Sequence, residues 1–140
     1  MMIYNVEFFR PEEFRCPCCG AGRPSAMLVL FLDQLRKAFN SPIRVNSGFR
    51  CAKHNAEVGG AERSRHLLGC AADIAPLLPE GPDTEEWKTF LRNQLFNFKM
   101  MAKRIFGNDG WEVKEYKTFM HVAVPRGETD RLWNGEAILL

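Results

Sequence analysis

Two histidines and an aspartate are the residues of this sequence best suited to bind a metal ion. His66 and Asp73 lie seven residues apart, on either side of the short segment 67–72, and His121 follows in the apolar run 119–124. Two imidazoles and a carboxylate form a three-ligand set for a catalytic zinc ion, because such sites leave the fourth coordination position open for water. These residue types therefore indicate metal-assisted hydrolysis.

Each of the three residues also has an ordinary structural explanation. A lone histidine such as His66 is more often a surface or packing residue, and His121 could be a core histidine satisfied by a backbone carbonyl. Asp73 lies in the apolar segment 71–75, where a buried carboxylate is costly unless it is paired or bound to a metal. An ion pair with an arginine, or a turn cap, is its alternative. The three residues together are harder to explain in this way than any one alone.

Short strands must position two of these residues. Alternating or small apolar side chains predict strands over 43–45, 71–75, 111–116 and 119–124, the last two as a hairpin. The strand over 71–75 carries Asp73, and the second strand of the hairpin carries His121. The pattern therefore places two candidate ligands on one sheet.

Helices are predicted over 25–40, 51–60 and 84–106. Ser25 is the expected N-cap of the first helix, and Asp83 or Thr84 caps the last one, which has acidic residues in its first turn. The expected inner face of this last helix consists of Trp87, Phe90, Leu91, Leu95, Phe98, Ala102 and Ile105.

The fold class expected from these elements is α+β, with a small antiparallel sheet and helices packed on one side. A chain of 140 residues is long enough for one ordinary core and too short for two. We expect a single domain over 1–140, with an irregular arm over 1–24 and a C-terminal extension over 126–140. The expected apolar anchors of the arm and the extension are Phe8, Phe9, Phe14, Leu132 and Trp133.

Charge and hydropathy argue against several classes of partner. The net charge is +2 and no dense patch of lysine and arginine occurs, so we expect no nucleic acid partner. The sequence has no run of 18 apolar residues, so no membrane span is expected. The N-terminal segment lacks the basic and apolar regions of a signal peptide, which indicates synthesis in the cytoplasm. The pattern does not predict an oligomeric state.

The five cysteines are Cys16, Cys18, Cys19, Cys51 and Cys70. An odd number, with three crowded together, argues against a secreted disulfide framework and indicates a reducing compartment. Zinc sites usually need two well-separated pairs of ligands, and only one cluster is obvious. Packing cysteines are therefore the favoured interpretation. The alternative is a disulfide, or a structural metal bound by the 16–19 cluster with Cys51, Cys70 or His54 as partner.

Several motifs follow one another along the chain: Ser47-Gly-Phe-Arg50, Asn55, Gly59-Gly60, Ser64-Arg-His66, Gly69-Cys-Ala-Ala-Asp73 and Phe119-Met-His121-Val. In this order they resemble the zinc D-alanyl-D-alanine peptidase family, peptidase family M15. That family includes peptidoglycan carboxypeptidases, vancomycin-resistance dipeptidases and many phage endolysins, and it shares its fold with the hedgehog signalling domain. The resemblance spans roughly residues 26–125.

The resemblance implies a role for each of five residues. It implies His66, Asp73 and His121 as zinc ligands. It also implies that Arg50 faces the substrate and binds its carbonyl oxygen or terminal carboxylate, for which a planar, permanently charged guanidinium is suited. Ser64 would lie near the same cleft and bond the substrate backbone, with a capping serine as its alternative.

The general base is where the sequence departs from the family pattern. Several members carry a glutamate three residues before the last histidine ligand, but that position is Thr118 here. Other members of the fold place a glutamate six residues before it, and that position is Glu115. We therefore expect Glu115 to act as general base, provided that the hairpin brings it to the cleft of His121. Glu112 is the fallback, although a solvated strand position is its better interpretation.

The resemblance implies a zinc-dependent peptidase that uses Zn²⁺ to hydrolyse stem-peptide bonds of peptidoglycan, of the D-Ala-D-Ala or L-Ala-D-Glu type. Together with the missing signal peptide, it implies a phage or prophage endolysin or a remodelling enzyme, acting at the bacterial cell wall after release. The alternative is a catalytically inactive metal-binding module of the same fold, serving as a phage structural or wall-binding part. Thr118 is the feature that favours this alternative.

Overall fold

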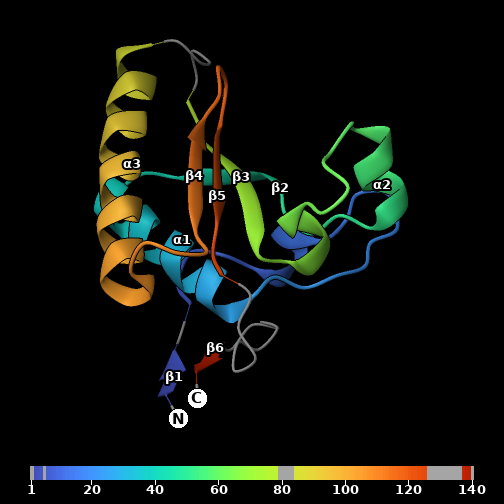
Figure 1. Cartoon of the computed structure of the whole chain (residues 1–140). Coiled ribbons are helices and arrows are strands. Elements are labelled where there is room, and N and C mark those ends of the chain that lie inside the picture. Colours follow the sequence, from blue (N-terminus) through green and yellow to red (C-terminus); the bar gives the residue numbers. More distant parts are fainter. Residues whose placement is uncertain (1, 5, 79–83, 126–136, 140) are drawn as a thin grey trace.

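The computed structural model describes residues 2–4, 6–78, 84–125 and 137–139. Its central element is an antiparallel sheet with the strand order β2-β3-β5-β4 (Figure 1). The four strands are β2 (Ile43–Ser47), β3 (Ala71–Pro76), β4 (Glu112–Glu115) and β5 (Met120–Ala123). All four were expected near these positions, and the α+β class is confirmed.

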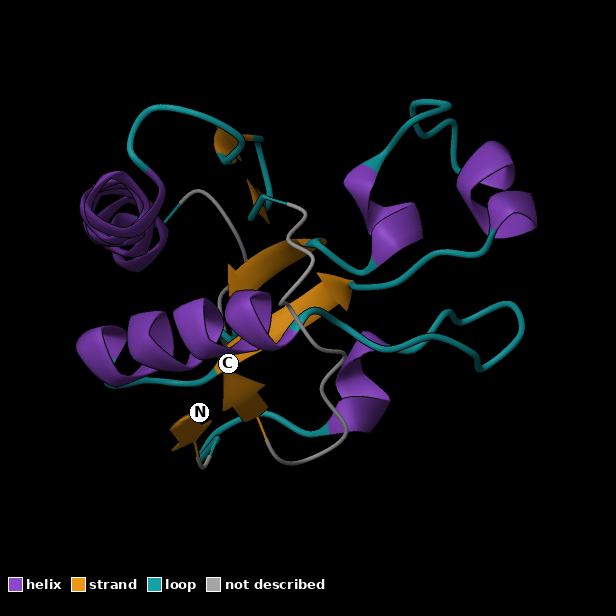
Figure 2. Cartoon of the chain, turned by 60° about the horizontal axis from the view of Figure 1, so that its bottom comes forward, coloured by secondary structure: helices purple, strands orange, loops and turns teal. Residues whose placement is uncertain are grey.

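One face of this sheet is apolar and packs against the two long helices. Ile74, Met120 and Val122 are fully buried and share one core with side chains of α1 (Ala26–Phe39) and α3 (Glu85–Phe106). Figure 2 shows these long helices on one side of the molecule and the short helices on the opposite side. The two long helices therefore pack on one side of the sheet, as expected, and the other face carries the polar residues Asp73 and His121.

Both long helices begin at the expected caps. The side chain of Ser25 accepts a hydrogen bond from the amide of Leu28, and the side chain of Thr84 accepts one from Trp87. These bonds satisfy amides that have no partner within the helix. One expectation for α3 was wrong: Ile105 is 52% exposed. The next residue, Phe106, packs against the core in its place.

The N-terminal segment is more ordered than the expected irregular arm. Strand β1 (Met2–Tyr4) pairs with β6 (Ala137–Leu139), and η1 (Pro11–Phe14) is a turn of 3-10 helix. The buried carboxylate of Asp33 accepts a hydrogen bond from the amide of Phe8 at 3.0 Å, which ties the segment to α1. The expected anchors Phe9 and Phe14 are buried, whereas the ring of Phe8 is 40% exposed.

Some expectations fall on residues outside the described part of the chain. These are the cap at Asp83 and the anchors Leu132 and Trp133. Among the described helices, none combines the length and the apolar composition that crossing a membrane requires.

Candidate metal centre

His66 is positioned by η2 (Arg65–Leu68), a turn of 3-10 helix that precedes β3. Ser64 caps this turn, and its Oγ accepts a hydrogen bond from the amide of His66 at 3.2 Å. The turn ends at Gly69, whose φ of 73° is a left-handed conformation that favours glycine. The carbonyl of His66 accepts a hydrogen bond from the amide of Arg50 at 3.0 Å, which joins η2 to the loop after β2.

Asp73 and His121 are positioned by strand pairing. They are direct partners on β3 and β5, and such partners place their side chains on the same face of an antiparallel sheet. Ile74 follows Asp73 and Met120 precedes His121, and both point into the core, so the two polar side chains point away from it. Asp73 is 7% exposed, so the burial expected for its carboxylate is confirmed.

The three candidate ligands converge on one point. Oδ1 of Asp73 lies 3.3 Å from Nε2 of His66 and 2.9 Å from Nδ1 of His121. One ligand atom from each residue lies within 4.8 Å of both others. A tetrahedral zinc ion with bonds of about 2.1 Å separates its ligands by about 3.4 Å. The chemistry and spacing of these atoms therefore fit a zinc ion.

The second nitrogen of each imidazole has its own partner. Nδ1 of His66 lies 2.7 Å from the carbonyl oxygen of Gly48, and Nε2 of His121 lies 2.9 Å from Oε1 of Glu112. A carbonyl can only accept, so Nδ1 of His66 carries the proton and Nε2 keeps its lone pair. A carboxylate on Nε2 of His121 likewise favours a proton there and leaves Nδ1 for a metal. Partners of this kind orient histidine ligands in metal sites.

The charges at the centre shift the pKa of three groups. Burial opposes the charged form of Asp73, but the hydrogen bonds from His121 and His66 outweigh it and hold the pKa of this carboxyl well below its usual range. Burial also opposes the protonation of His121, but bonds to Asp73 and Glu112 raise its pKa. The same imidazole lowers the pKa of Glu112 against the effect of burial. Without a metal, the protonated imidazole of His121 bridges the carboxylates of Asp73 and Glu112.

Arg50 lies in the wall of the centre and is held by three acceptors. Its Nε donates to Ser47 Oγ at 3.0 Å, one Nη to Asn55 Oδ1 at 3.2 Å, and the other to Asp73 Oδ2 at 3.1 Å. The arginine partner that the sequence left open for Asp73 therefore exists, and it binds the carboxylate oxygen that faces away from the histidines. Each Nη carries a second N–H, so Arg50 can also donate to a ligand in the cleft.

The structure separates the two glutamates that the sequence offered as general base. The amide of Tyr116 donates to the carbonyl of Phe119 at 2.9 Å and closes a two-residue turn. This turn pairs Lys114 with His121 and Glu115 with Met120. The exposed Glu115 therefore lies on the opposite face of the sheet from His121, and the shared cleft expected for them is not formed. Glu112, two residues before Lys114, lies on the same face as His121.

A cleft of about 600 Å³ opens in front of the centre. Its volume is typical of a small-molecule or peptide site. Besides the three candidate ligands, the lining includes Arg50, Arg63, Ser64, Glu112 and Lys114. The cap bond of Ser64 uses the hydroxyl as acceptor, so its proton can be donated into the cleft. Four basic side chains line the cleft outside the candidate metal ligands, namely Arg50, Arg63, Arg65 and Lys114, and the cleft is therefore suited to an anionic ligand.

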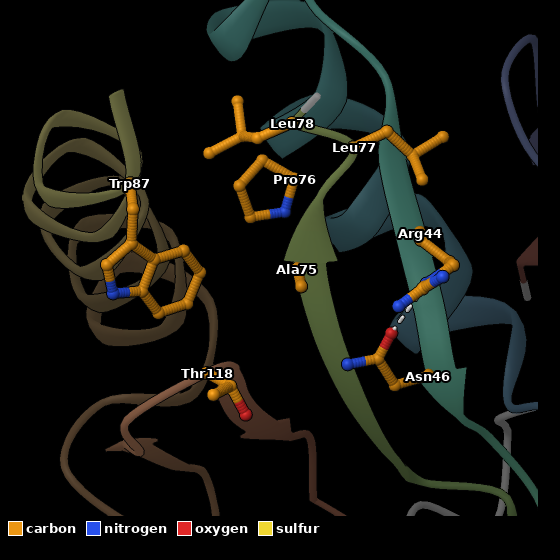
Figure 3. A pocket seen from close by; sticks show the side chains of 8 residues that line it. All are labelled: Arg44, Asn46, Ala75, Pro76, Leu77, Leu78, Trp87 and Thr118. Carbon is orange, nitrogen blue, oxygen red and sulfur yellow. Dashed lines mark hydrogen bonds between the residues drawn. The ribbon is translucent and has the colours of Figure 1, made fainter. Parts of the chain in front are cut away.

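A second pocket, of about 340 Å³, lies further along the same face of the sheet (Figure 3). Arg44 is paired with Ala75, which follows Asp73 by two residues and so shares its face. Nε of Arg44 donates to Asn46 Oδ1 at 2.9 Å across the pocket wall. Thr118, at the position where several members of the M15 family carry a glutamate, lines this pocket and does not line the metal cleft.

The hydrogen-bond partners of the two histidines, Gly48 and Glu112, were not identified as such from the sequence. The carbonyl of Gly48 has no signature in a sequence, because every residue has one. Glu112 was considered only as a fallback base, although a two-residue turn at 117–118 would have placed it on the face of His121. The length of that turn is the signal that sequence reasoning missed.

Comparison with known proteins agrees with this geometry. A family model described as Peptidase M15 matches residues 8–123. The chain is also 44% identical over 79 residues to the zinc D-Ala-D-Ala carboxypeptidase of Streptomyces albus G, in an alignment that covers 49% of this chain and 31% of that protein. The matched region therefore spans about a third of the length of this curated relative.

Proposed function

Because the chain belongs to the peptidase M15 family, we propose that it is a zinc-dependent peptidase whose metal is bound by His66, Asp73 and His121. The observation that carries this proposal is the convergence of three ligand atoms within 4.8 Å at the wall of a basic cleft. Each histidine presents one nitrogen to this point and has a partner on the other nitrogen. A core histidine or a simple ion pair would need no such arrangement.

Zinc bound at this point would act as a Lewis acid that activates water and polarises the scissile carbonyl. The chain would contribute fixed ligands and fixed charges. The carbonyl of Gly48 holds the proton on Nδ1 of His66, and Glu112 holds the proton on Nε2 of His121. Arg50 holds the free oxygen of Asp73 and directs its remaining N–H groups to the carbonyl oxygen or carboxylate of the substrate. Ser64 donates to the substrate backbone.

The proposed substrate is the stem peptide of peptidoglycan. Stem peptides carry several carboxylates, and the cleft presents Arg50, Arg63 and Lys114 to them. The relative from Streptomyces albus G is named for the D-Ala-D-Ala bond, and we propose a bond of the D-Ala-D-Ala or L-Ala-D-Glu type. The second pocket, with Arg44 and Asn46, lies on the same face and could hold the next residues of an extended peptide.

We assign Glu112 as a positioning residue. Its carboxylate lies on the far side of the imidazole of His121, bonded to the nitrogen that does not face the metal. It therefore acts on the ligand and not on a water molecule at the metal. The base role that we expected for Glu115 has no geometric support, because Glu115 is on the other face of the sheet.

The test uses purified peptidoglycan fragments, with products identified by mass spectrometry. We expect a chelator to abolish cleavage and added zinc to restore it. Glu112→Gln keeps an acceptor for His121 and should retain most of the activity, whereas Glu112→Ala should weaken zinc binding and lower the activity at limiting zinc. Glu115→Gln is the matched control and should behave as the wild type. Loss of turnover with full metal content in Glu115→Gln would restore the base role of that residue.

One observation favours the alternative of an inactive metal-binding module. Asp73 and Glu112 are the two carboxylates among the described residues that line the cleft, and both are engaged by histidines. A protein with one zinc ion at this centre that binds muropeptides but never cleaves them would establish this alternative.

The biological role that we propose follows from the resemblance to the M15 family. We propose a phage or prophage endolysin or a remodelling enzyme that acts at the cell wall. A single domain over 1–140 remains a prediction. Lysis of cells with an exposed peptidoglycan layer by the added protein would support the endolysin role, and cleavage limited to soluble muropeptides would contradict it.

A further inference from the structure

Four of the five cysteines gather at one place, remote in sequence from the metal centre. Sγ of Cys16 lies 3.6 Å from Sγ of Cys51, which lies 3.9 Å from Sγ of Cys18. The three sulfur atoms all lie within 4.8 Å of one another. The thiol of Cys19 also interacts with those of Cys16 and Cys51. All of these cysteines are free thiols.

The spacing of the sulfur atoms matches a tetrahedral thiolate site. Zinc binds cysteine sulfur at about 2.3 Å, so two sulfurs of one tetrahedron are separated by about 3.8 Å. The measured separations of 3.6 and 3.9 Å lie on either side of this value. Cys51 lies 35 residues after Cys16 in the sequence, and the fold brings it to the cluster.

Backbone amides point at two of these sulfurs, as they do around thiolate ligands. The amide of Cys51 donates to Sγ of Cys16 at 3.5 Å, and the amide of His54 donates to Sγ of Cys51 at 3.4 Å. Hydrogen bonds from backbone amides to sulfur favour the thiolate form.

Packing does not explain the cluster, because Cys18 and Cys19 are exposed. Only Cys70, which is buried and outside the cluster, fits the packing interpretation.

We propose that Cys16, Cys18 and Cys51, with Cys19 as the fourth thiol, bind a second zinc ion with a structural role. Four sulfur ligands would close the coordination sphere, as in structural zinc sites, and would leave no position for substrate. The ion would join the N-terminal segment to the loop that follows β2.

That loop is the one that supports the catalytic centre. The amide of Phe49 donates to the carbonyl of Phe14 at 2.9 Å, and Gly48 lies so close to Phe14 that a Cβ there would stand 2.7 Å from its Cα. Gly48 holds His66 through its carbonyl, and Arg50 immediately precedes Cys51. The thiolate site would therefore fix the backbone that positions both of these groups.

Metal analysis tests the proposal independently of peptidase activity. Protein purified under reducing conditions with zinc should contain two zinc ions per chain. The double variant His66→Ala/His121→Ala should keep one ion, and Cys18→Ser/Cys51→Ser should also keep one. Equal zinc content in the cysteine variant and the wild type would overturn the proposal. If the peptidase proposal fails but this one holds, the ion in the histidine variant will still be released by a thiol-specific mercurial reagent.

Cobalt substitution identifies the ligands. Cobalt bound by several thiolates gives intense ligand-to-metal charge-transfer absorption, which a site with two histidines and an aspartate does not give. We expect this absorption in the wild type, in His66→Ala/His121→Ala and in the control Cys70→Ala. It should be weakened in the single variant Cys18→Ser, which changes an exposed residue, and lost in Cys18→Ser/Cys51→Ser. Absence of the absorption in the wild type, or oxidation of the cluster to a disulfide in freshly purified protein, would refute the site.

Discussion

Removal of the Glu112 carboxylate tests whether the sheet raises the zinc affinity of the centre by orienting His121. Oε1 of Glu112 lies 2.9 Å from Nε2 of His121, and this bond selects the imidazole tautomer that offers Nδ1 to the metal. Outer partners of this kind typically contribute a factor of 10 to 100 in metal affinity. Glu112→Ala should therefore weaken zinc binding.

The exposure of the carboxylate sets the expected size of the effect. The Glu112 side chain is 36% exposed, so solvent screens its charge and the lower end of the range applies. We expect a loss of about tenfold in zinc affinity, equivalent to about 1.4 kcal/mol. Glu112→Gln keeps an acceptor but loses the charge, and bonds to neutral partners are about half as strong as charge-assisted ones. Its loss should be about threefold.

Competition with a chromophoric chelator at fixed pH measures both affinities. The ion at the cysteine cluster is counted separately in the His66→Ala/His121→Ala variant, so that only the catalytic centre is compared. Glu115→Ala removes a carboxylate of the same strand from the other face and should leave the affinity unchanged. An unchanged affinity in Glu112→Ala, or an equal loss in Glu115→Ala, would refute the positioning role derived from the strand register.

Three further predictions concern the same centre. The pKa of His121 is raised in the metal-free protein, and zinc needs the neutral imidazole, so zinc affinity should fall steeply as the pH drops through this raised value. Calorimetric titrations at several pH values measure this affinity. An affinity that stays constant until well below the ordinary histidine pKa of 6.5 would contradict the prediction. Asp73→Ala leaves Arg50 and His121 without their buried partner and should destabilise the metal-free protein by about 3 kcal/mol, as measured by urea unfolding, whereas an unchanged midpoint would argue against the ion pair. Gly48→Ala places a Cβ 2.7 Å from the Cα of Phe14 and should cost about 1–3 kcal/mol together with a loss of catalytic zinc, and a variant with wild-type stability and zinc content would show that the loop can move aside.

The candidate ligands and the main elements could be identified from the sequence because their signals are local. Ser25 and Thr84 cap the long helices where the sequence places them, and the apolar segments around Asp73 and His121 form the predicted strands. These features depend on neighbouring residues and on a motif order that the peptidase M15 family shares.

The faces of the two glutamates and the cysteine cluster were not predictable because both depend on tertiary geometry. A spacing of six residues between Glu115 and His121 does not reveal which face each occupies, since a change of one residue in register reverses every side chain of a strand. The two-residue turn pairs Glu115 with Met120. Likewise, Cys51 reaches Cys16 only because the loop after β2 packs on the N-terminal segment.

The most direct test of the proposed peptidase is the incubation of purified muropeptides with the protein, with and without a chelator, followed by mass spectrometry. The geometry of His66, Asp73 and His121 predicts loss of D-alanine, or cleavage between L-alanine and D-glutamate, that stops when the chelator is present and returns with zinc. Intact muropeptides in the presence of protein that carries zinc at these three residues would contradict a hydrolytic function.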